Sequence, residues 1–326
     1  MHPNTPRQAR TVVVGGGTMG ADVAVVLARG GAQVTVVDPH ATRREQLPSH
    51  IAHALATAGQ AQHAGPVLVC ASLQDVDWTD VVLVVECITE QLAAKQALFA
   101  ELQPLAPATA VLASNSSGFP ISAIAQGLAT AQRMLGLHFF MPAHLVPLVE
   151  VVLGERSDPE LGHWLHAFMR GCGSVPVLVK KDKPGFLANR MQHALSREAF
   201  ALIDEGIASP EDVDAAVRFG FGFRFLAAGP VLQRDHAGIE VHTAAAATMY
   251  PTLSNTAVPA RALQEKVAQG HLGMKTGKGF FDWPDERRRA ERDRYDSLLR
   301  QGLALLAPEL PSLPNASTPT TPGAPT

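Results

Sequence analysis

Residues 11–38, TVVVGGGTMGADVAVVLARGGAQVTVVD, decide the fold of the first part of the chain. A short apolar run at 12–14 leads into a glycine-rich turn, and apolar residues then recur at helical spacing beyond Gly20. A second apolar run at 33–37 closes on Asp38. Strand, glycine turn, helix and second strand in this order predict the opening unit of a dinucleotide-binding sheet.

The glycines of the turn have separate tasks in such a unit. Gly15 permits a tight turn, Gly17 lets the backbone approach a pyrophosphate, and Gly20 lets the helix pack on the strand. Thr18 and Met19 stand at the start of the helix, where free N–H groups attract phosphate groups. We therefore predict that the turn binds the phosphates of a dinucleotide.

Asp38 indicates which dinucleotide is bound. An acidic side chain at the end of the second strand can hydrogen-bond both ribose hydroxyls and repels a 2′-phosphate. It therefore favours NAD over NADP, although Arg43 and Arg44 nearby argue weakly for the phosphate. The alternative interpretation, a glycine-rich surface turn, does not explain why an acidic residue stands at the end of the second strand. The predicted cofactor is NAD.

Composition narrows the class of protein. The 326 residues, 46% of them hydrophobic, suit two domains, and a formal net charge of −3 argues against a nucleic-acid or membrane partner. Small molecules are the expected partners. The N-terminus lacks an apolar signal sequence, so we expect a cytoplasmic protein. Cys70, Cys87 and Cys172 are interpreted as reduced core residues, because their spacing is not that of metal ligands, and we predict no metal site.

Further apolar runs alternate with helical segments. Strands that are buried on both faces and separated by helices are typical of a mainly parallel, doubly wound sheet, an α/β fold of the Rossmann-like type. Ligands of such sheets bind beyond the carboxyl ends of the strands. The runs that we predict as strands are 67–70, 81–85, 110–113, 134–140, 148–153 and 175–179.

The strand pattern ends before a polar linker that begins near residue 180. Residues 183–307 then show helical spacing, and Ser209-Pro210-Glu211-Asp212 has the cap and proline of a helix start. From Pro308 onward, prolines recur among serine, threonine and alanine, which predicts a disordered tail over 308–326. We therefore predict a dinucleotide-binding domain over 1–182, a helical domain over 183–307, and this tail.

A histidine and a glutamate stand on neighbouring predicted strands. Residues 134–140 and 148–153 are joined by a proline-containing turn, so His138 and Glu150 are expected to meet. A carboxylate beside an imidazole fixes its tautomer and favours its charged form, which suits a general base. The alternative is a strand histidine bonded to a backbone carbonyl and a glutamate that faces water.

Two more polar segments follow strand ends and point at the same crevice. One carries Glu90 and Lys95, and the other is Ser114–Ser117, which includes Asn115. Each has an ordinary interpretation, because Ser-Asn-Ser-Ser-Gly is a good turn and cap sequence, and Glu90 with Lys95 suits a charged first helical turn. Lys95 is, however, the first lysine of the chain, so it is not one of many surface lysines in this region.

Two residues of the helical domain are candidates for substrate binding. Asn189 stands in the first turn of a long predicted helix, where it either faces the crevice or only caps and solvates the helix. Arg224 stands among phenylalanines and glycines, where an unpaired guanidinium is costly to desolvate. Its expected partner is either a carboxylate of the protein, the commoner case, or a carboxylate of the substrate.

These motifs, in this order, resemble the L-3-hydroxyacyl-CoA dehydrogenase family over nearly the whole chain before the tail. The resemblance implies a Rossmann-like NAD-binding domain, a helical substrate domain that forms a homodimer, and NAD-dependent oxidation of a 3-hydroxy group to a ketone, as in fatty acid metabolism. The motifs are GGGTMG, Asp38, VVECITE with Lys95, SNSSG, HFFMP, PLVEVV, KDKPGFLANR, DEGIASPEDVD and GMKTGKGFF.

The resemblance also implies a role for each candidate. His138 would take the hydroxyl proton as hydride leaves for the nicotinamide, and Glu150 would orient and stabilise the imidazole. Ser117 and Asn189 would hydrogen-bond the substrate oxygen. The residues implied to contact the cofactor are Gly15, Gly17, Thr18, Met19, Gly20, Asp38, Glu90, Lys95 and Asn115.

Three departures from the family leave the substrate open. Met141 replaces the usual asparagine, the segment between Asp38 and Val67 is short and lysine-free, and Arg224 stands where fatty-acyl members tend to be uncharged. These features resemble L-gulonate 3-dehydrogenase (the lambda-crystallin group) and carnitine dehydrogenase. We predict an (S)-3-hydroxyacyl substrate. The alternatives are a free polar 3-hydroxy acid, another small alcohol or aldehyde, and a crystallin-like structural protein.

Overall fold

The computed structural model describes residues 2–313 and divides into two compact units. Within the described residues, unit 1 comprises residues 2–189 and 307–313, and unit 2 comprises Arg190–Leu306. Pro308 and Glu309, expected to begin a disordered tail, belong to a short 3-10 helix, and Leu313 lies beside Gly173. Residues 310–313 are described as well, and residues 314–326 of the predicted tail lie outside the described residues.

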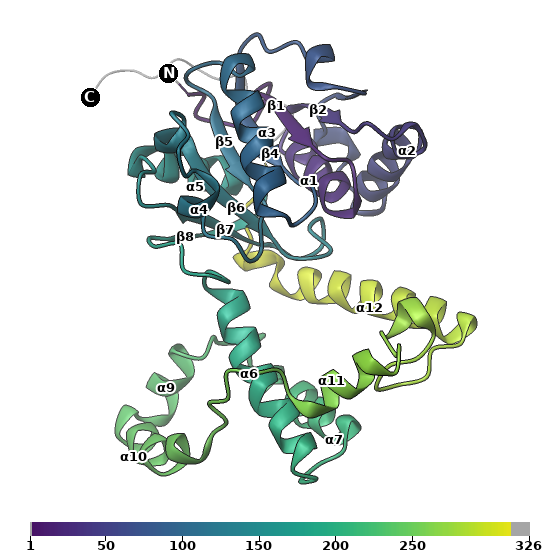
Figure 1. The fold of residues 1–326 in the computed structure, drawn as a ribbon, viewed down its shortest axis with the longest axis vertical. Helices are drawn as coiled ribbons and strands as arrows, with labels where there is room; N and C mark the ends of the chain where they lie inside the picture. Colours follow the sequence, from purple (N-terminus) through teal and green to yellow (C-terminus); the bar gives the residue numbers. More distant parts are fainter. Residues whose placement is uncertain (1, 314–326) are drawn as a thin grey trace. The chain divides into compact units, whose positions relative to one another are not determined.

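Unit 1 is built on an eight-stranded sheet with the strand order β3-β2-β1-β4-β5-β6-β7-β8 (Figure 1). Neighbouring strands are parallel except β6 and β7, which are antiparallel. The predicted mainly parallel α/β sheet is therefore confirmed. The strands are β1 (Arg10–Val14), β2 (Gln33–Val37), β3 (Val67–Cys70), β4 (Val81–Glu86), β5 (Val111–Ser114), β6 (Met134–Phe139), β7 (Leu148–Leu153) and β8 (Val175–Val179).

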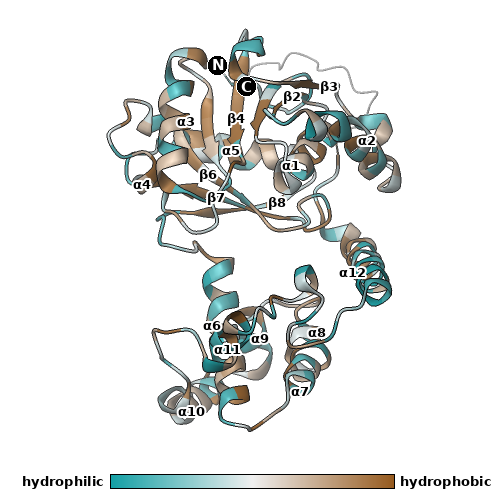
Figure 2. Ribbon diagram, turned by 45° about the vertical axis from the view of Figure 1, so that its right-hand side comes forward, coloured by the Kyte–Doolittle hydropathy of each residue, from teal (hydrophilic) through white to brown (hydrophobic). Residues whose placement is uncertain are grey.

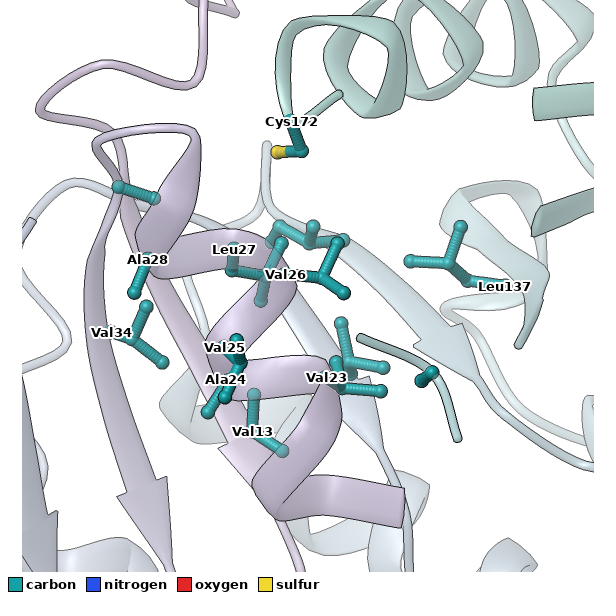
Figure 3. Packing of buried hydrophobic residues seen from close by; sticks show 14 of the residues in the cluster. Val13, Val23, Ala24, Val25, Val26, Leu27, Ala28, Val34, Leu137 and Cys172 are labelled. Carbon is teal, nitrogen blue, oxygen red and sulfur yellow. The ribbon is translucent and has the colours of Figure 1, made fainter. Parts of the chain in front are cut away.

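Helices cover both faces of this sheet. Alternate residues of a strand point to opposite faces, so Val13 joins the core under α1, α2 and α5, while Val12 and Val14 join the core under α3 and α4. Figure 3 shows the first core, where buried residues of α1 pack between β1 and Cys172. The helices are α1 (Thr18–Arg29), α2 (Ala41–Thr57), α3 (Leu92–Leu105), α4 (Ile121–Ile124) and α5 (Pro159–Gly171), with 3-10 turns η1 (Ala61–His63), η2 (Leu73–Asp75) and η3 (Ala131–Arg133).

The described residues of unit 2 form helices and no named strand. The predicted helix start at Ser209 is confirmed, because its Oγ accepts a hydrogen bond from the Asp212 amide at 3.1 Å. Figure 2 shows hydrophobic and hydrophilic residues mixed along these helices. They are α6 (Ala188–Asp204, which starts in unit 1), α7 (Pro210–Ala215), the π-helix η4 (Ala216–Phe221), α8 (Gly222–Arg224), α9 (Leu232–Ala237), α10 (Ile239–Met249), α11 (Arg261–Ala268) and α12 (Asp285–Leu306), with 3-10 turns η5 (Tyr250–Thr252), η6 (Met274–Thr276) and η7 (Ala307–Glu309).

Candidate active site

His138 and Glu150 are direct cross-strand partners in the β6–β7 pair. Their side chains lie on the same face, and His138 Nδ1 is 2.7 Å from Glu150 Oε2. Both residues are buried, with 2% of His138 and none of Glu150 exposed. The sequence prediction that these two side chains meet is confirmed. The alternative of a glutamate that faces water is wrong.

The second ring nitrogen of His138 faces Ser117. Nε2 lies 3.1 Å from Ser117 Oγ, and Ser117 is exposed in the turn after β5. Because an ionised carboxylate only accepts hydrogen bonds, Nδ1 donates to Glu150, and Nε2 is the nitrogen at which a proton can be taken up or released. A chain of polar groups therefore runs from an exposed hydroxyl through a basic nitrogen to a buried carboxylate.

Glu150 is held by the backbone as well as by His138. Its Oε1 accepts hydrogen bonds from the amides of Leu187 at 3.0 Å and Ala188 at 2.8 Å. Burial by itself would raise the pKa of Glu150, but the bond to His138, these two amides and the charge of His138 hold that pKa below its ordinary value. Glu150 is consequently ionised at neutral pH.

A buried network begins at the end of β4. Glu86 is fully buried, and its carboxylate accepts hydrogen bonds from Lys95 Nζ at 2.7 Å and from the Ser114 hydroxyl at 2.6 Å. Lys95 Nζ also lies 3.1 Å from Glu90 Oε2. The Lys95 side chain is only 1% exposed and is paired with two carboxylates of the protein. The structure thus places Lys95 beside Glu90, and its contact with the cofactor stays a prediction.

Glu90 links this network to the turn that carries Ser117. Its Oε1 accepts hydrogen bonds from the Ser116 hydroxyl at 2.6 Å and from the amides of Ser117 and Gly118 at 3.1 and 3.0 Å. Burial would raise the pKa of Glu90, but these donors and Lys95 keep it below its ordinary value. The side chain is still 44% exposed, so it can face a ligand.

Asn115 joins the ends of two strands. Its Oδ1 accepts a hydrogen bond from the Phe139 amide at 2.9 Å, one residue after His138. Asn115, Ser117 and His138 therefore stand together at the carboxyl ends of β5 and β6, as the sequence predicted for the crevice.

The glycine turn brings β1, α1 and β4 close together. Gly15 has a positive φ of 99°, and a Cβ there would lie 2.7 Å from the Cys87 carbonyl oxygen. A Cβ at Gly20 would collide with the Gly15 carbonyl oxygen. At Gly17 a Cβ would meet no protein atom within 4 Å, and the start of α1 has neither a side-chain cap nor an acidic residue in its first turn. The positive helix end at Thr18 and Met19 therefore suits an anionic ligand.

Asp38 closes the other side of this turn. Its Oδ2 accepts a hydrogen bond from the Gly16 amide and its Oδ1 one from the His40 amide, both at 2.8 Å. Arg43 Nη1 lies 3.5 Å from the same carboxylate, and Arg44 donates to backbone carbonyls. Both arginines are thus engaged by the protein, which weakens the argument for a 2′-phosphate.

The two candidates from the helical domain differ in position. Asn189 is half-buried in the first turn of α6, directly after the amides that bind Glu150, and belongs to unit 1. Arg224 ends α8 in unit 2 and is exposed. The expectation that Arg224 is desolvated is wrong for this structure, so its charge does not require a carboxylate of the protein.

Sequence reasoning missed two parts of the site. The clamp from Leu187 and Ala188 uses backbone amides, which leave no trace in residue types. The segment from Glu86 to Glu90 was expected at the crevice, but the role of Glu86 as acceptor for Lys95 and Ser114 was not predicted; its place at the end of a buried strand was the available signal. Among the described residues, no cluster of potential ligands could hold a metal ion, and no helix could cross a membrane.

Comparison with known proteins agrees with this geometry. Residues 10–183 match the NAD binding domain of 3-hydroxyacyl-CoA dehydrogenase, and residues 185–283 match the C-terminal domain. The chain is 33% identical over 288 residues to 5-formyl-3-hydroxy-2-methylpyridine 4-carboxylate 5-dehydrogenase of Mesorhizobium japonicum, covering 85% of this chain and 92% of that protein.

Solved structures give the same picture. A 5-formyl-3-hydroxy-2-methylpyridine 4-carboxylic acid 5-dehydrogenase, described as an NAD+-dependent dismutase, matches with a TM-score of 0.86 and 31% identity over 91% of this chain and 98% of that one. The (S)-3-hydroxybutyryl-CoA dehydrogenase of Ralstonia eutropha matches with a TM-score of 0.69 and 28% identity over 85% and 99%. The cofactor of such a domain is NAD.

Proposed function

The protein belongs to the 3-hydroxyacyl-CoA dehydrogenase family of NAD-dependent oxidoreductases acting on CH–OH groups, and from this premise we propose that His138 is its general base. The observation that carries the proposal is the hydrogen-bonded chain from Ser117 through His138 to Glu150. Nε2 is the nitrogen free to accept a proton, and it lies beside the exposed end of the chain.

In the proposed reaction, the substrate hydroxyl lies against Nε2 of His138 and gives up its proton there. Glu150 stabilises the imidazolium that forms, because its carboxylate already binds Nδ1. Ser117 and Asn189 hold the substrate oxygen by hydrogen bonds. Bound NAD supplies the acceptor for the hydride that leaves the same carbon.

The proposed cofactor contacts lie along the carboxyl edge of the sheet. Gly15, Gly17 and Gly20 shape the turn, while the amides of Thr18 and Met19 receive the pyrophosphate. Asp38 receives the adenosine ribose, and Glu90 and Asn115 stand toward the nicotinamide side. We propose that Lys95, which is paired with Glu86 and Glu90, acts on the same side both as a cofactor contact and as a support of Glu90. The Ser116 hydroxyl, the Gly118 amide and Lys95 together hold the pKa of Glu90 below its ordinary value.

The proposed substrate is an (S)-3-hydroxyacyl compound, which would place the protein in fatty acid metabolism. A second candidate is a carboxylate-bearing heteroaromatic aldehyde or alcohol. The specific support for it is the pair of matches to a pyridine carboxylate dehydrogenase, with a TM-score of 0.86 against 0.69 for the hydroxybutyryl-CoA enzyme. The absence of lysine from α2 also favours a substrate without coenzyme A. We propose exposed Arg224 as the anchor for a substrate carboxylate or thioester end.

A panel assay separates these substrates. NADH formation would be followed with 3-hydroxybutyryl-CoA, free gulonate, carnitine, 3-hydroxybutyrate and the formyl pyridine carboxylate. NADH formation with 3-hydroxybutyryl-CoA, whose 3-hydroxyl is oxidised, supports the (S)-3-hydroxyacyl substrate. If instead the aldehyde is consumed and yields equal amounts of acid and alcohol without net NADH, the second class and a dismutase activity are supported. No turnover of any compound under these conditions would contradict both substrate proposals.

We also propose that the protein is a cytoplasmic homodimer. Support for the dimer is the number of exposed large apolar side chains on unit 2, including Phe219 at 74%, Phe223 at 66% and Val231 at 79%. Support for the location is that Cys70, Cys87 and Cys172 are all free thiols.

A further inference from the structure

The chain enters α6 through a tight turn next to the dyad. The Phe186 amide donates to the Lys183 carbonyl oxygen at 2.9 Å, and Pro184 and Gly185 occupy the two central positions of this turn. Gly185 has a φ of 76°, as the third position of a type II turn requires. Phe186 also has a positive φ, 49°, which is costly for a bulky side chain. The surrounding structure must therefore hold Phe186 in this conformation.

The side chain of Phe186 packs against the catalytic imidazole. Phe186 is only 4% exposed and joins the core on the α3 and α4 side of the sheet. Its ring centroid lies 5.6 Å from that of His138 at an interplanar angle of 61°, and the Phe140 ring lies 4.6 Å away at 62°. Two edge-to-face contacts thus restrict the imidazole, in the geometry that aromatic pairs prefer.

The next two residues bind the partner of that imidazole. The amides of Leu187 and Ala188 converge on Oε1 of Glu150, so one carboxylate oxygen serves the backbone and the other serves His138. Glu150 is completely buried, and a carboxylate oxygen without a donor there would be costly. The two amides fix the rotation of the carboxylate and hence the direction in which Oε2 faces His138.

We propose that Phe186–Ala188 is a positioning segment for the dyad: the Phe186 ring orients His138, and the Leu187 and Ala188 amides orient Glu150. This inference rests on the proposed function, because it assigns the segment a role in proton transfer to His138. The positive φ of Phe186 directs the ring and the two following amides to the two members of the dyad. The segment acts through the dyad and touches no reacting atom itself.

Removal of one amide gives the sharpest test. Ala188 is the first residue of α6, where proline is tolerated, so Ala188→Pro deletes the N–H and leaves the helix able to form. Ala188→Gly is the matched variant, because it keeps the N–H. We expect the kcat of Ala188→Pro to lie at least about tenfold below that of Ala188→Gly. The KM for NAD should agree within about twofold between the two variants, and so should the Kd for NADH. Equal kcat values in the two variants would overturn the proposed amide clamp.

A second pair of variants tests the contact between the Phe186 ring and His138. This pair tests the positioning segment even if Ala188→Pro does not fold. Phe186→Leu keeps an apolar side chain without an aromatic ring, and Phe186→Tyr keeps the ring. We expect Phe186→Leu to lower kcat by about tenfold with little change in the KM for NAD, and Phe186→Tyr to recover most of that loss. A loss confined to thermal stability, or a KM effect without a kcat effect, would reject the positioning role of the ring.

The proposed function can fail separately from this inference. Substitution of His138 tests the function, because a fully active His138→Gln enzyme would remove the base on which both ideas depend. If His138→Gln is inactive while Ala188→Pro matches Ala188→Gly and Phe186→Leu matches the wild type, the function stands and the positioning segment is rejected.

Discussion

The two units of the molecule bury their side chains to very different degrees. In unit 1, residues of the sheet such as Val13, Leu112 and Leu137 are at most 1% exposed, and both faces are covered by helices. In unit 2, Ala228 and Gly279 are the only residues of the described part classed as buried. Large apolar side chains remain exposed there, although several helices are amphipathic.

This difference shows that unit 1 buries its apolar side chains within its own chain, whereas unit 2 leaves many of them exposed. A doubly wound sheet closes its own core, because each face is covered by helices of the same chain. A helix with an apolar face needs an opposing layer, and exposed apolar patches of this kind mark interaction surfaces. Unit 1 accordingly holds the rigid dyad, whereas unit 2 is expected to gain its missing layer from a partner.

The largest expected effect is on catalysis in the packed unit. We expect His138→Gln to lower kcat by about 10²- to 10⁴-fold, the usual range for loss of a positioned acid–base group. The measurement is steady-state NADH formation with the best substrate of the panel. Binding of NADH should be retained, because the glycine turn is untouched. Wild-type turnover in this variant would refute the general-base role.

Equal side-chain truncations in the two units should cost very different amounts of stability. Leu112→Ala in β5 should lower the free energy of unfolding by about 2–5 kcal/mol, because Leu112 is fully buried. Leu232→Ala, at a residue that is 49% exposed, should cost less than about 0.5 kcal/mol at low protein concentration. Urea titrations at several protein concentrations provide the measurement.

Protein concentration makes that comparison sharper. If a partner copy covers Leu232, the cost of Leu232→Ala grows with concentration, because dimer formation stabilises the native state by mass action. The cost of Leu112→Ala should not change in this way. Equal costs at Leu112 and Leu232 at every concentration would remove the contrast between the two units.

A charge on the exposed face of unit 2 tests the dimer directly. Phe223 is 66% exposed, and Phe223→Asp should weaken self-association by at least about tenfold if this face is the interface. Phe223→Tyr is the control, since it keeps the ring and adds no charge. Sedimentation equilibrium measures both variants. A wild-type monomer at all concentrations would contradict the homodimer proposal.

The hydrogen-bonded Glu150 carboxylate of unit 1 should appear in the pH dependence of stability. The pKa of Glu150 is lower in the folded state than its ordinary value, so its stabilising effect is complete above the unfolded pKa of 4.5 and is lost as pH falls through the lower folded pKa. The gap in unfolding free energy between wild type and Glu150→Gln should therefore narrow below pH about 4.5. Urea midpoints across this range test it, and a gap that widens on acidification would show the opposite sign.

The smallest predicted effect is at Arg224. Because Arg224 is exposed and proposed to anchor a substrate anion, Arg224→Ala should raise the KM for substrate by about tenfold while kcat changes little. Arg224→Lys keeps the positive charge and should recover part of the loss. An unchanged KM would reject the anchor role.

Local pattern was sufficient for the sheet and for the dyad. Continuous apolar runs bounded by turns predicted each strand of unit 1 to within a residue or two, and the pairing of two consecutive runs placed His138 opposite Glu150. These predictions succeeded because strand periodicity and a short connection act within a few tens of residues.

Contacts between distant segments could not be obtained in that way. Lys95 suggested a cofactor contact, and the sequence did not show that folding would also pair it with Glu86 and Glu90. Arg224 suggested a desolvated cation, but its side chain is exposed. In both cases the environment of a charge depends on residues that the local sequence does not specify.

The sequence by itself determined the order of strands and helices along the chain of unit 1, the glycine turn with Asp38, and the position of His138 opposite Glu150. Only the tertiary structure decided what supports them: the two amides on Glu150, the Phe186 ring on His138, and the burial of Lys95. The physical reason is that residue types and their periodicity encode local conformation and burial. Backbone donors and ring packing acquire partners only when the chain closes on itself.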